Sequence, residues 1–254
     1  MASAARPPSP RLDAGGPTTR FRRMRSTMAV TAGAVAALAG CTSGGAGAPP
    51  ETGGDEVIGS ASQDESTPCI VSLHGKGGDA TPTETSGGLT LLGPRGNDEG
   101  WGGRQWNYLD DDSYAAAVSI VAGSIEDDAC DSVAIHGFSN GASFAARLYC
   151  DAETFGGRLV GVVIDDPVTD TATENCEPDP DVDATLYWTG ALESQAPAGT
   201  DCGGIDWTCK DGVVIGIGAF ADAAGLDVTP SPFVEHRRFD DAPDPARWLE
   251  DVDA

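Results

Sequence analysis

The sequence predicts an α/β fold in which a mostly parallel sheet is flanked by helices. Two observations lead to this class. Short apolar runs alternate with helical patterns from about residue 69 to the end of the chain, which is the order typical of α/β domains. The segment 159–164 reads LVGVVI, a continuous apolar run of the kind found in parallel strands that are buried on both faces.

Each segment of this pattern has an expected element. Strands are expected at 69–73, 88–92, 132–136, 159–164 and 184–188, with a last edge strand within 227–235 that Pro230 and Pro232 interrupt. Helices are expected at 113–125 with Ser113 as cap, at 140–149, at 212–224, and from the cap Asp244 to about Val252 with Pro245 in the first turn.

One domain is expected over residues 69–254, which is long enough to bury a single hydrophobic core. Residues 42–68 consist mainly of Gly, Ser, Pro, Thr and acidic residues and have no apolar period. We therefore expect segment 41–68 to be a flexible tether in front of the domain.

Residues 1–40 are expected to be a signal peptide of the lipoprotein type. Basic residues between Arg20 and Arg25 precede the apolar run 28–40, which is too short to span a bilayer. The run ends in Leu38-Ala-Gly-Cys41, which resembles the bacterial lipobox. The resemblance implies lipidation of Cys41, palmitate labelling, and a protein held outside the cytoplasm on the cell membrane of a bacterium. A plain secretory signal with a cysteine nearby is the alternative.

The charge of the chain excludes some classes of partner. Its formal net charge is −25, and the six Arg and one Asp of residues 1–40 leave −30 on the remainder. Such an acidic protein is not expected to bind nucleic acid, or to bind anionic lipid through surface charge. Any membrane attachment is therefore expected through the lipid alone.

Six cysteines remain if Cys41 carries a lipid. An even number in an exported chain indicates disulfides, and the candidates are Cys69, Cys130, Cys150, Cys176, Cys202 and Cys209. Cys202 and Cys209 are close enough in sequence to close a local loop. A zinc site is the alternative, but the sequence has no CxxC pair and only three His, so no metal is expected.

Ser139 is the strongest candidate for a nucleophile. The segment Gly137-Phe-Ser139-Asn-Gly141 lies between an expected strand and an expected helix. A serine exposed on a sharp strand-to-helix turn needs small residues two positions to either side, and this GxSxG pattern is the nucleophile elbow. A structural Gly-Ser turn is the alternative reading of the pentapeptide.

The Gly-rich segment His74-Gly-Lys76-Gly-Gly78 follows the first expected strand. A turn of this kind can direct a backbone N–H toward a substrate oxygen. The expected oxyanion hole is formed by the N–H groups of Lys76 and Asn140. A phosphate-binding loop is disfavoured, because the spacing fits neither GxGxxG nor GxxxxGK[ST].

Elimination among the three histidines selects His236 as the general base. His74 belongs to the Gly-rich turn, and His136 lies within the strand before Ser139. His236 follows the last expected strand, where this arrangement requires the base, although a surface His beside Arg237 is the alternative.

The orienting acid has several candidates, because the chain is rich in carboxylates. Glu193, three residues after Gly190 and close behind the strand 184–188, is the first choice. Asp165 and Asp166 at the end of the preceding strand are the alternatives, and Asp206 is a more distant one.

The HGKGGDA and GFSNG segments together resemble the α/β-hydrolase superfamily, within it the phospholipase/carboxylesterase group and the polyhydroxybutyrate-depolymerase-like esterases. The resemblance spans about residues 69–250 but rests on four short segments. It implies a minimal α/β-hydrolase fold without the usual first two strands. It also implies that the strands after Cys69 and Cys130 are neighbours, so these cysteines pair, which leaves Cys150 for Cys176.

These features predict a serine esterase that cleaves short or soluble carboxylic esters through an acyl-enzyme, with no cofactor. The expected partner is a small ester substrate, and the protein is expected to be a monomer. Trp101 and Trp106 are candidates for a pocket wall or, equally, for anchors on the core. Two alternatives remain: a non-catalytic envelope lipoprotein that binds through a hydrolase fold, and a serine peptidase of the same fold.

Overall fold

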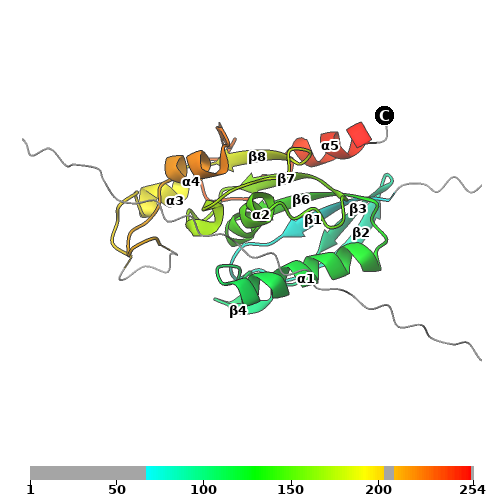
Figure 1. The fold of residues 1–254 in the computed structure, drawn as a ribbon, viewed down its shortest axis with the longest axis horizontal. Coiled ribbons are helices and arrows are strands. Elements are labelled where there is room, and N and C mark those ends of the chain that lie inside the picture. Colours follow the sequence, from blue (N-terminus) through cyan, green and yellow to red (C-terminus); the bar gives the residue numbers. More distant parts are fainter. Residues whose placement is uncertain (1–66, 203–208, 253–254) are drawn as a thin grey trace, which may run out of the picture. The chain divides into compact units, whose positions relative to one another are not determined.

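A computed structural model describes residues 67–202 and 209–252. The expected signal peptide, the tether up to residue 66, Cys41 and Asp206 lie outside the described residues. Figure 1 shows a central sheet with helices around it. In chain order the elements are β1 (Pro68–Leu73), β2 (Thr81–Ser86), β3 (Leu89–Gly93), β4 (Asp98–Gly100), β5 (Gly103–Gln105), α1 (Asp111–Asp127), β6 (Ser132–Phe138), α2 (Asn140–Cys150), β7 (Leu159–Asp165), the 3-10 turn η1 (Thr171–Thr173), β8 (Asp183–Trp188), α3 (Ala191–Gln195), α4 (Ile217–Ala224), β9 (Val228–Pro230) and α5 (Asp244–Val252).

The main sheet has seven strands in the order β2-β3-β1-β6-β7-β8-β9. Every neighbouring pair is parallel except β2 and β3, which are antiparallel. The predicted α/β class with a mostly parallel sheet flanked by helices is therefore confirmed. Strands β1 and β6 are in register from Pro68 with Ser132 to Leu73 with Gly137, so the Gly-rich turn and Ser139 follow neighbouring strand ends.

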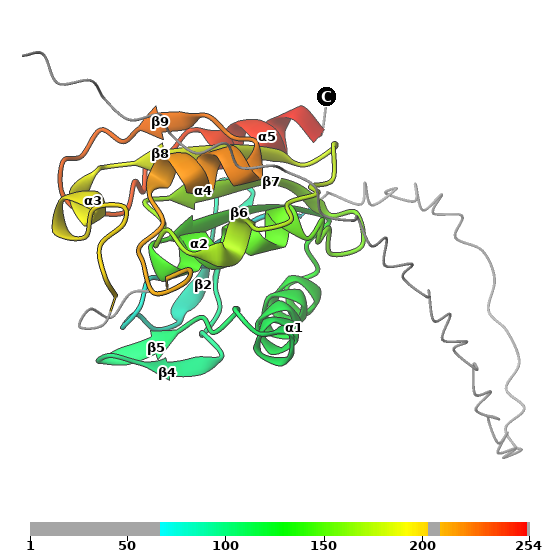
Figure 2. The ribbon, with the colours of Figure 1, turned by 60° about the vertical axis from the view of Figure 1, so that its left-hand side comes forward.

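The two faces of the sheet are covered by different helices. On one face α1, α2 and α4 pack over a cluster that contains Val121, Phe144, Phe220 and Ile135. On the other face Trp248 and Leu249 of α5 pack on a smaller cluster, and Figure 2 shows α5 behind the sheet and α2 and α4 in front of it. Strand β6 is buried along almost its whole length, as expected for a central parallel strand covered on both faces.

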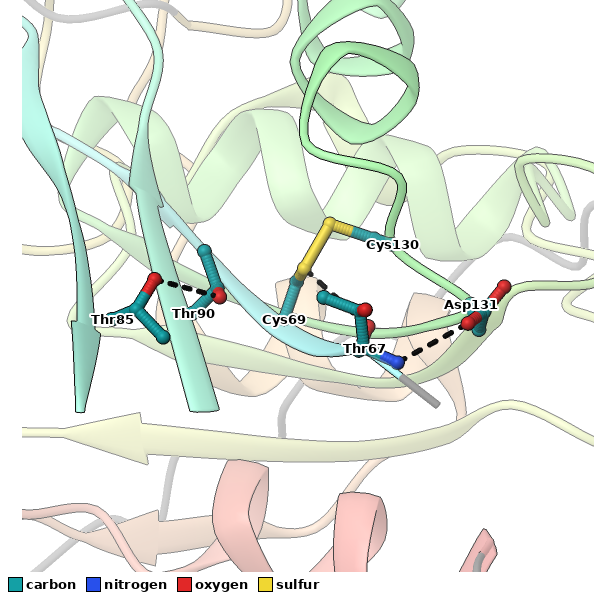
Figure 3. Close-up of a disulfide and its surroundings, with 6 residues drawn as sticks. All are labelled: Thr67, Cys69, Thr85, Thr90, Cys130 and Asp131. Carbon is teal, nitrogen blue, oxygen red and sulfur yellow. Dashed lines mark hydrogen bonds between the residues drawn. A yellow bond between two sulfur atoms is a disulfide. The ribbon is translucent and has the colours of Figure 1, made fainter. Parts of the chain in front are cut away.

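Three disulfides join the six candidate cysteines in the expected pairs: Cys69 with Cys130, Cys150 with Cys176, and Cys202 with Cys209. The first pair lies where β1 begins, close to the segment that leads into β6 (Figure 3). Beside it the Thr67 N–H donates to Asp131 at 3.2 Å, so two links hold the start of β1.

Several element boundaries differ from the expectations. The cap of α1 is Asp110, whose side chain accepts the Ser113 N–H, so Ser113 lies inside the helix. Helix α4 begins at Ile217 instead of residue 212, because Val214 exchanges backbone hydrogen bonds with Gly199 and Thr200. Strand β2 was not expected, since all six of its side chains are exposed and its sequence TPTETS has no apolar alternation.

Candidate active site

Ser139 lies on the turn between β6 and α2. Its backbone has φ 55° and ψ −118°, a positive φ that is uncommon for a residue with a side chain. The turn is tight: a Cβ on Gly137 would lie 2.3 Å from the Gly141 carbonyl oxygen, and a Cβ on Gly141 would lie 2.4 Å from that of Leu73. Only glycine fits at both positions, which gives the GxSxG pattern a physical cause.

His236 contacts Ser139 directly. Its Nε2 lies 2.9 Å from Ser139 Oγ. His236 belongs to the segment 231–243 between β9 and α5, and the Phe138 ring stacks on the imidazole at 4.7 Å between centroids. The structure therefore brings together the expected nucleophile and the expected base, which are 97 residues apart in sequence.

The carboxylate at the His236 ring is that of Asp166. Asp166 Oδ2 lies 2.5 Å from His236 Nδ1, and Asp166 is fully buried just after β7. Its carboxylate also accepts the Thr189 N–H at 3.0 Å and the Thr189 hydroxyl at 2.8 Å. An ionised carboxylate only accepts hydrogen bonds, so Nδ1 carries a proton and Nε2 is left to accept the Ser139 hydroxyl.

The structure does not bring Glu193, the first choice for the acid, to His236. Glu193 lies on the short helix α3 after β8, while both ring nitrogens of His236 are already engaged by Ser139 and Asp166. The carboxylate that contacts His236 belongs to Asp166, one of the two alternatives, which follows β7 and not β8. Strands β7 and β8 are parallel neighbours, so carboxylates behind either strand reach the same edge of the sheet, and the sequence alone did not separate them.

Asp165, the other alternative, makes different contacts. Its Oδ2 accepts the backbone N–H of Phe239 at 2.6 Å and lies 3.4 Å from Nε2 of His136. The two adjacent aspartates therefore contact different parts of the same segment, since Asp166 meets the imidazole and Asp165 meets the backbone three residues further on.

The Gly-rich turn lies against the nucleophile. A Cβ on Gly75 would come 3.1 Å from Cβ of Ser139. Lys76 and Asn140, the residues expected to supply oxyanion N–H groups, both line a cavity of about 140 Å³ together with Trp106, Tyr108 and Val168. Asn140 is also the first residue of α2, so its N–H belongs to the end of the helix that favours negative charge.

His74 holds this turn as a neutral ring. Its Nε2 accepts the Gly96 N–H at 3.1 Å, so Nδ1 carries the proton and donates to the Gly75 carbonyl at 2.8 Å. Burial lowers the pKa of His74 below its ordinary value, which keeps the acceptor at Nε2 available. His74 is thus a support of the turn, as its assignment to the Gly-rich segment implied.

The side chain of Asn140 has a contact that the sequence did not reveal. Its Oδ1 accepts the Trp106 N–H at 2.7 Å and its Nδ2 donates to the Trp106 carbonyl at 3.1 Å. Trp106 is buried and stacks on Phe144 at 5.0 Å, and it lines the small cavity. Trp101 is different: it lies in the β4–β5 hairpin and is 85% exposed.

A larger cavity of about 670 Å³ lies between η1 and α4 and is lined by neither Ser139, His236 nor Asp166. Asp170 lies on its wall and accepts hydrogen bonds from the Tyr108 hydroxyl and the Ala172 N–H. Burial raises the pKa of Asp170 to about 6. None of Ser139, His236 and Asp166 lines the smaller cavity either, but Asn140, the residue directly after Ser139, does.

Within residues 67–202 and 209–252, no helix has the length and apolar character needed to cross a bilayer. The same described ranges contain no group of three His, Cys, Asp or Glu side chains arranged to hold a metal ion.

Comparison with known proteins finds similar solved structures only. No family model and no curated protein sequence matches the chain. A Bacillus cereus carboxylesterase is 17% identical with a TM-score of 0.46, covering 75% of this chain and 89% of its own. A Pyrococcus furiosus esterase is 12% identical with a TM-score of 0.40, covering 74% and 82%. A protein of unknown function from Agrobacterium tumefaciens is 18% identical with a TM-score of 0.43, covering 74% and 92%. These similarities are too weak to assign an activity.

Proposed function

We propose that this protein is a serine hydrolase that cleaves carboxylic esters through an acyl-enzyme. The observation that carries the proposal is the continuous hydrogen-bonded series Ser139, His236, Asp166, with 2.9 Å and 2.5 Å between successive partners. Its members have the geometry of a nucleophile, a general base and an orienting acid, and they follow one another in the chain in the order Ser, Asp, His.

The reaction follows from the protonation states. His236 Nε2 takes the Ser139 hydroxyl proton as Oγ attacks the acyl carbonyl carbon, and it returns that proton to the leaving alcohol oxygen. Water then attacks the acyl-enzyme, gives a proton to Nε2, and releases the carboxylic acid as Ser139 recovers its hydroxyl. Asp166 keeps the ring in the required tautomer and stabilises its positive charge.

The N–H groups of Lys76 and Asn140 are proposed to hold the oxyanion. Two features support this assignment: both residues line the cavity of about 140 Å³, and Asn140, which directly follows Ser139, begins α2. Removal of one oxyanion donor would lower the rate by about 100- to 1000-fold.

We propose the cavity lined by Lys76 and Asn140 as the acyl site, and its size favours a short acyl group. Its volume is about 140 Å³, and a water molecule occupies roughly 30 Å³ of liquid, so the space suits a chain of a few carbon atoms. The acidic surface, with a net charge of −25, disfavours anionic substrates. Among p-nitrophenyl esters, kcat/KM is expected to be highest for acetate to butyrate and to fall for octanoate.

A fluorophosphonate probe tests the central proposal. Labelling of the wild type, with loss of label and of p-nitrophenyl acetate turnover in Ser139→Ala, would support it. Ser119→Ala is the matched control, because Ser119 is an exposed serine on α1 whose hydroxyl bonds only its own helix. If folded wild-type protein neither labels nor turns over ester, the non-catalytic lipoprotein is favoured, and peptide panels would separate a peptidase from an esterase.

We also propose that the protein is exported and anchored by a lipid on Cys41. The Leu38-Ala-Gly-Cys41 sequence and the three disulfides of the domain support this location. Palmitate labelling should occur in the wild type and disappear in Cys41→Ala. Persistent label, or wild-type protein found wholly in the medium, would contradict the anchor.

A further inference from the structure

The segment that carries His236 needs an external support. Residues 231–243, between β9 and α5, contain no helix or strand, and Val234, two residues before His236, is 92% exposed. No ladder of backbone hydrogen bonds therefore fixes the base, although catalysis requires its Nε2 within hydrogen-bond distance of Ser139 Oγ. Asp166 and Phe138 contact the imidazole itself, so the backbone that carries the ring depends on contacts elsewhere in the segment.

Two such contacts lie directly after His236, and both reach the sheet. The Phe239 N–H donates to Asp165 Oδ2 at 2.6 Å. The Arg238 guanidinium donates through Nη1 to the Ser72 hydroxyl at 2.6 Å and through Nη2 to the His136 carbonyl at 3.5 Å. The acceptors lie on β7, β1 and β6, the three central neighbours of the sheet, so the segment is attached to its most rigid part.

Burial of the Asp165 carboxylate costs folding free energy, which is not expected of a residue whose only role is stability. Its side chain is fully buried, and no described residue hydrogen-bonds its Oδ1. Burying a carboxylate that is only partly hydrogen-bonded opposes folding, and a buried ionic group is weak evidence for stability. The His136 Nε2 lies 3.4 Å from Asp165 Oδ2, and the Arg238 guanidinium interacts with Asp165 electrostatically.

Aromatic packing also holds segment 231–243, but it fixes the position of the backbone less precisely than a hydrogen bond does. The Phe239 ring meets Tyr187 edge-on at 5.2 Å and Phe233 at 6.0 Å. Such ring contacts tolerate small shifts along the packed surface, whereas a short N–H to carboxylate bond is directional. The Asp165 contact is therefore the one that fixes the backbone three residues from the base.

We propose that Asp165 is a positioning residue for the general base: by binding the Phe239 N–H it sets the separation of His236 Nε2 from Ser139 Oγ. The adjacent aspartates then divide two tasks, since Asp166 binds the imidazole and Asp165 binds the backbone that delivers it. This inference rests on the proposed esterase function, in which Asp165 itself touches neither substrate nor the reacting atoms.

The test compares Asp165→Ala, Asp165→Asn and Asp241→Asn. In Asp165→Ala the acceptor is lost, and a displacement of the base near 1 Å would lower kcat by about 10- to 100-fold with little change in KM. In Asp165→Asn the amide oxygen can still accept the Phe239 N–H, so most of kcat should return. Asp241 lies in the same segment and is exposed, so Asp241→Asn should retain wild-type kcat.

A readout that needs no turnover separates this inference from the proposed function. The chain has three histidines, so the His236 Nδ1 proton can be assigned by NMR with His236→Gln as reference. We expect its low-field signal in the wild type and in Asp165→Asn, and its loss in Asp165→Ala. If the wild type hydrolyses no ester and reacts with no phosphonate, the proposed function fails while the NMR test of Asp165 still stands.

Three results would overturn the inference. One is a folded Asp165→Ala variant with wild-type kcat and an unchanged His236 signal. Another is an Asp165→Asn variant as impaired as Asp165→Ala, because that would make the charge and not the acceptor the important property. If Asp165→Ala does not fold, Asp165→Leu fills the same buried space without an acceptor or a charge, and a wild-type kcat and His236 signal in that variant would overturn the inference.

Discussion

Replacing Asp166 by Asn tests the assignment of the acid most directly, because the two side chains have nearly the same shape. Thr189 N–H needs an acceptor at Oδ1, 3.0 Å away, and the amide oxygen would take that place. The amide nitrogen would then face His236 Nδ1, where Asp166 Oδ2 now lies at 2.5 Å. Two N–H groups cannot share one hydrogen bond, so the imidazole would place its proton on Nε2.

A proton on Nε2 prevents His236 from accepting the Ser139 hydroxyl proton. The same change of tautomer in an established Ser-His-Asp triad lowers kcat by about 10⁴-fold, which corresponds to about 5 kcal/mol of transition-state stabilisation. We expect a loss of this order for Asp166→Asn with KM little changed, since the substrate contacts are untouched.

The assay is kcat for p-nitrophenyl acetate, measured for Asp166→Asn and for Glu193→Gln side by side. Glu193→Gln should stay within about twofold of the wild type, because Glu193 lies on α3 and neither ring nitrogen of His236 is free for it. An Asp166→Asn enzyme that kept more than about a tenth of wild-type kcat would refute the tautomer argument. A larger loss in Glu193→Gln than in Asp166→Asn would return the acid to Glu193.

Three further changes have expected outcomes. Replacing both Cys69 and Cys130 by Ala opens a loop with a separation of 61 residues; the chain-entropy relation gives about 4 kcal/mol of lost stability, and urea unfolding with a loss below about 1 kcal/mol would contradict it. Asp170→Asn should flatten the pH dependence of stability. The pKa of Asp170 is raised from 3.8 to about 6, so the folded state binds the carboxyl proton more tightly than the unfolded state does. The stability that this proton contributes is present below about pH 4 and falls by about 2–3 kcal/mol as the pH rises to 6. Thermal unfolding of wild type and variant between pH 4 and 7 measures this, and parallel curves would disprove it. Gly141→Ala places a Cβ 2.4 Å from the Leu73 carbonyl oxygen, and overpacking of this kind costs about 1–3 kcal/mol of stability. Both the stability in urea and the rate of phosphonate labelling should therefore fall. An unchanged labelling rate would show that the turn tolerates the methyl group.

The parts of the fold that the sequence predicted well are the buried ones. Strand β7 was expected at 159–164 and spans Leu159–Asp165, because a strand covered on both faces has a continuous apolar run. Strand β2 was missed for the opposite reason, since a wholly exposed edge strand leaves no periodic signal. The cap of α1 was misplaced because Asp110, Asp111, Asp112 and Ser113 are all suitable cap residues, and their spacing does not rank them.

Some residues of the candidate site could be predicted from the sequence and others could not. Ser139 was predictable, because the glycines on either side are needed by local backbone geometry. His236 followed from elimination among only three histidines. The carboxylate that contacts His236 did not follow, because the choice between Asp166 and Glu193 depends on where a segment without regular structure places one imidazole. That position is decided by contacts between residues about 70 positions apart. The bond of the Asn140 side chain to the Trp106 backbone was equally invisible, since no local pattern specifies it.

The exposed outer strands have a consequence for how copies of this protein behave in concentrated solution. An open sheet edge is a template for another strand, and intermolecular pairing at such edges is a common route to aggregates. Here β2 contains Pro82, an acidic residue at Glu84 and an irregular register against β3, and β9 is only three residues long and ends in Pro230. Proline removes a backbone donor, and irregular register bends the edge away from a flat partner. Both edge strands of the sheet therefore oppose strand pairing with another molecule, so we expect the protein to resist edge-to-edge aggregation at high concentration.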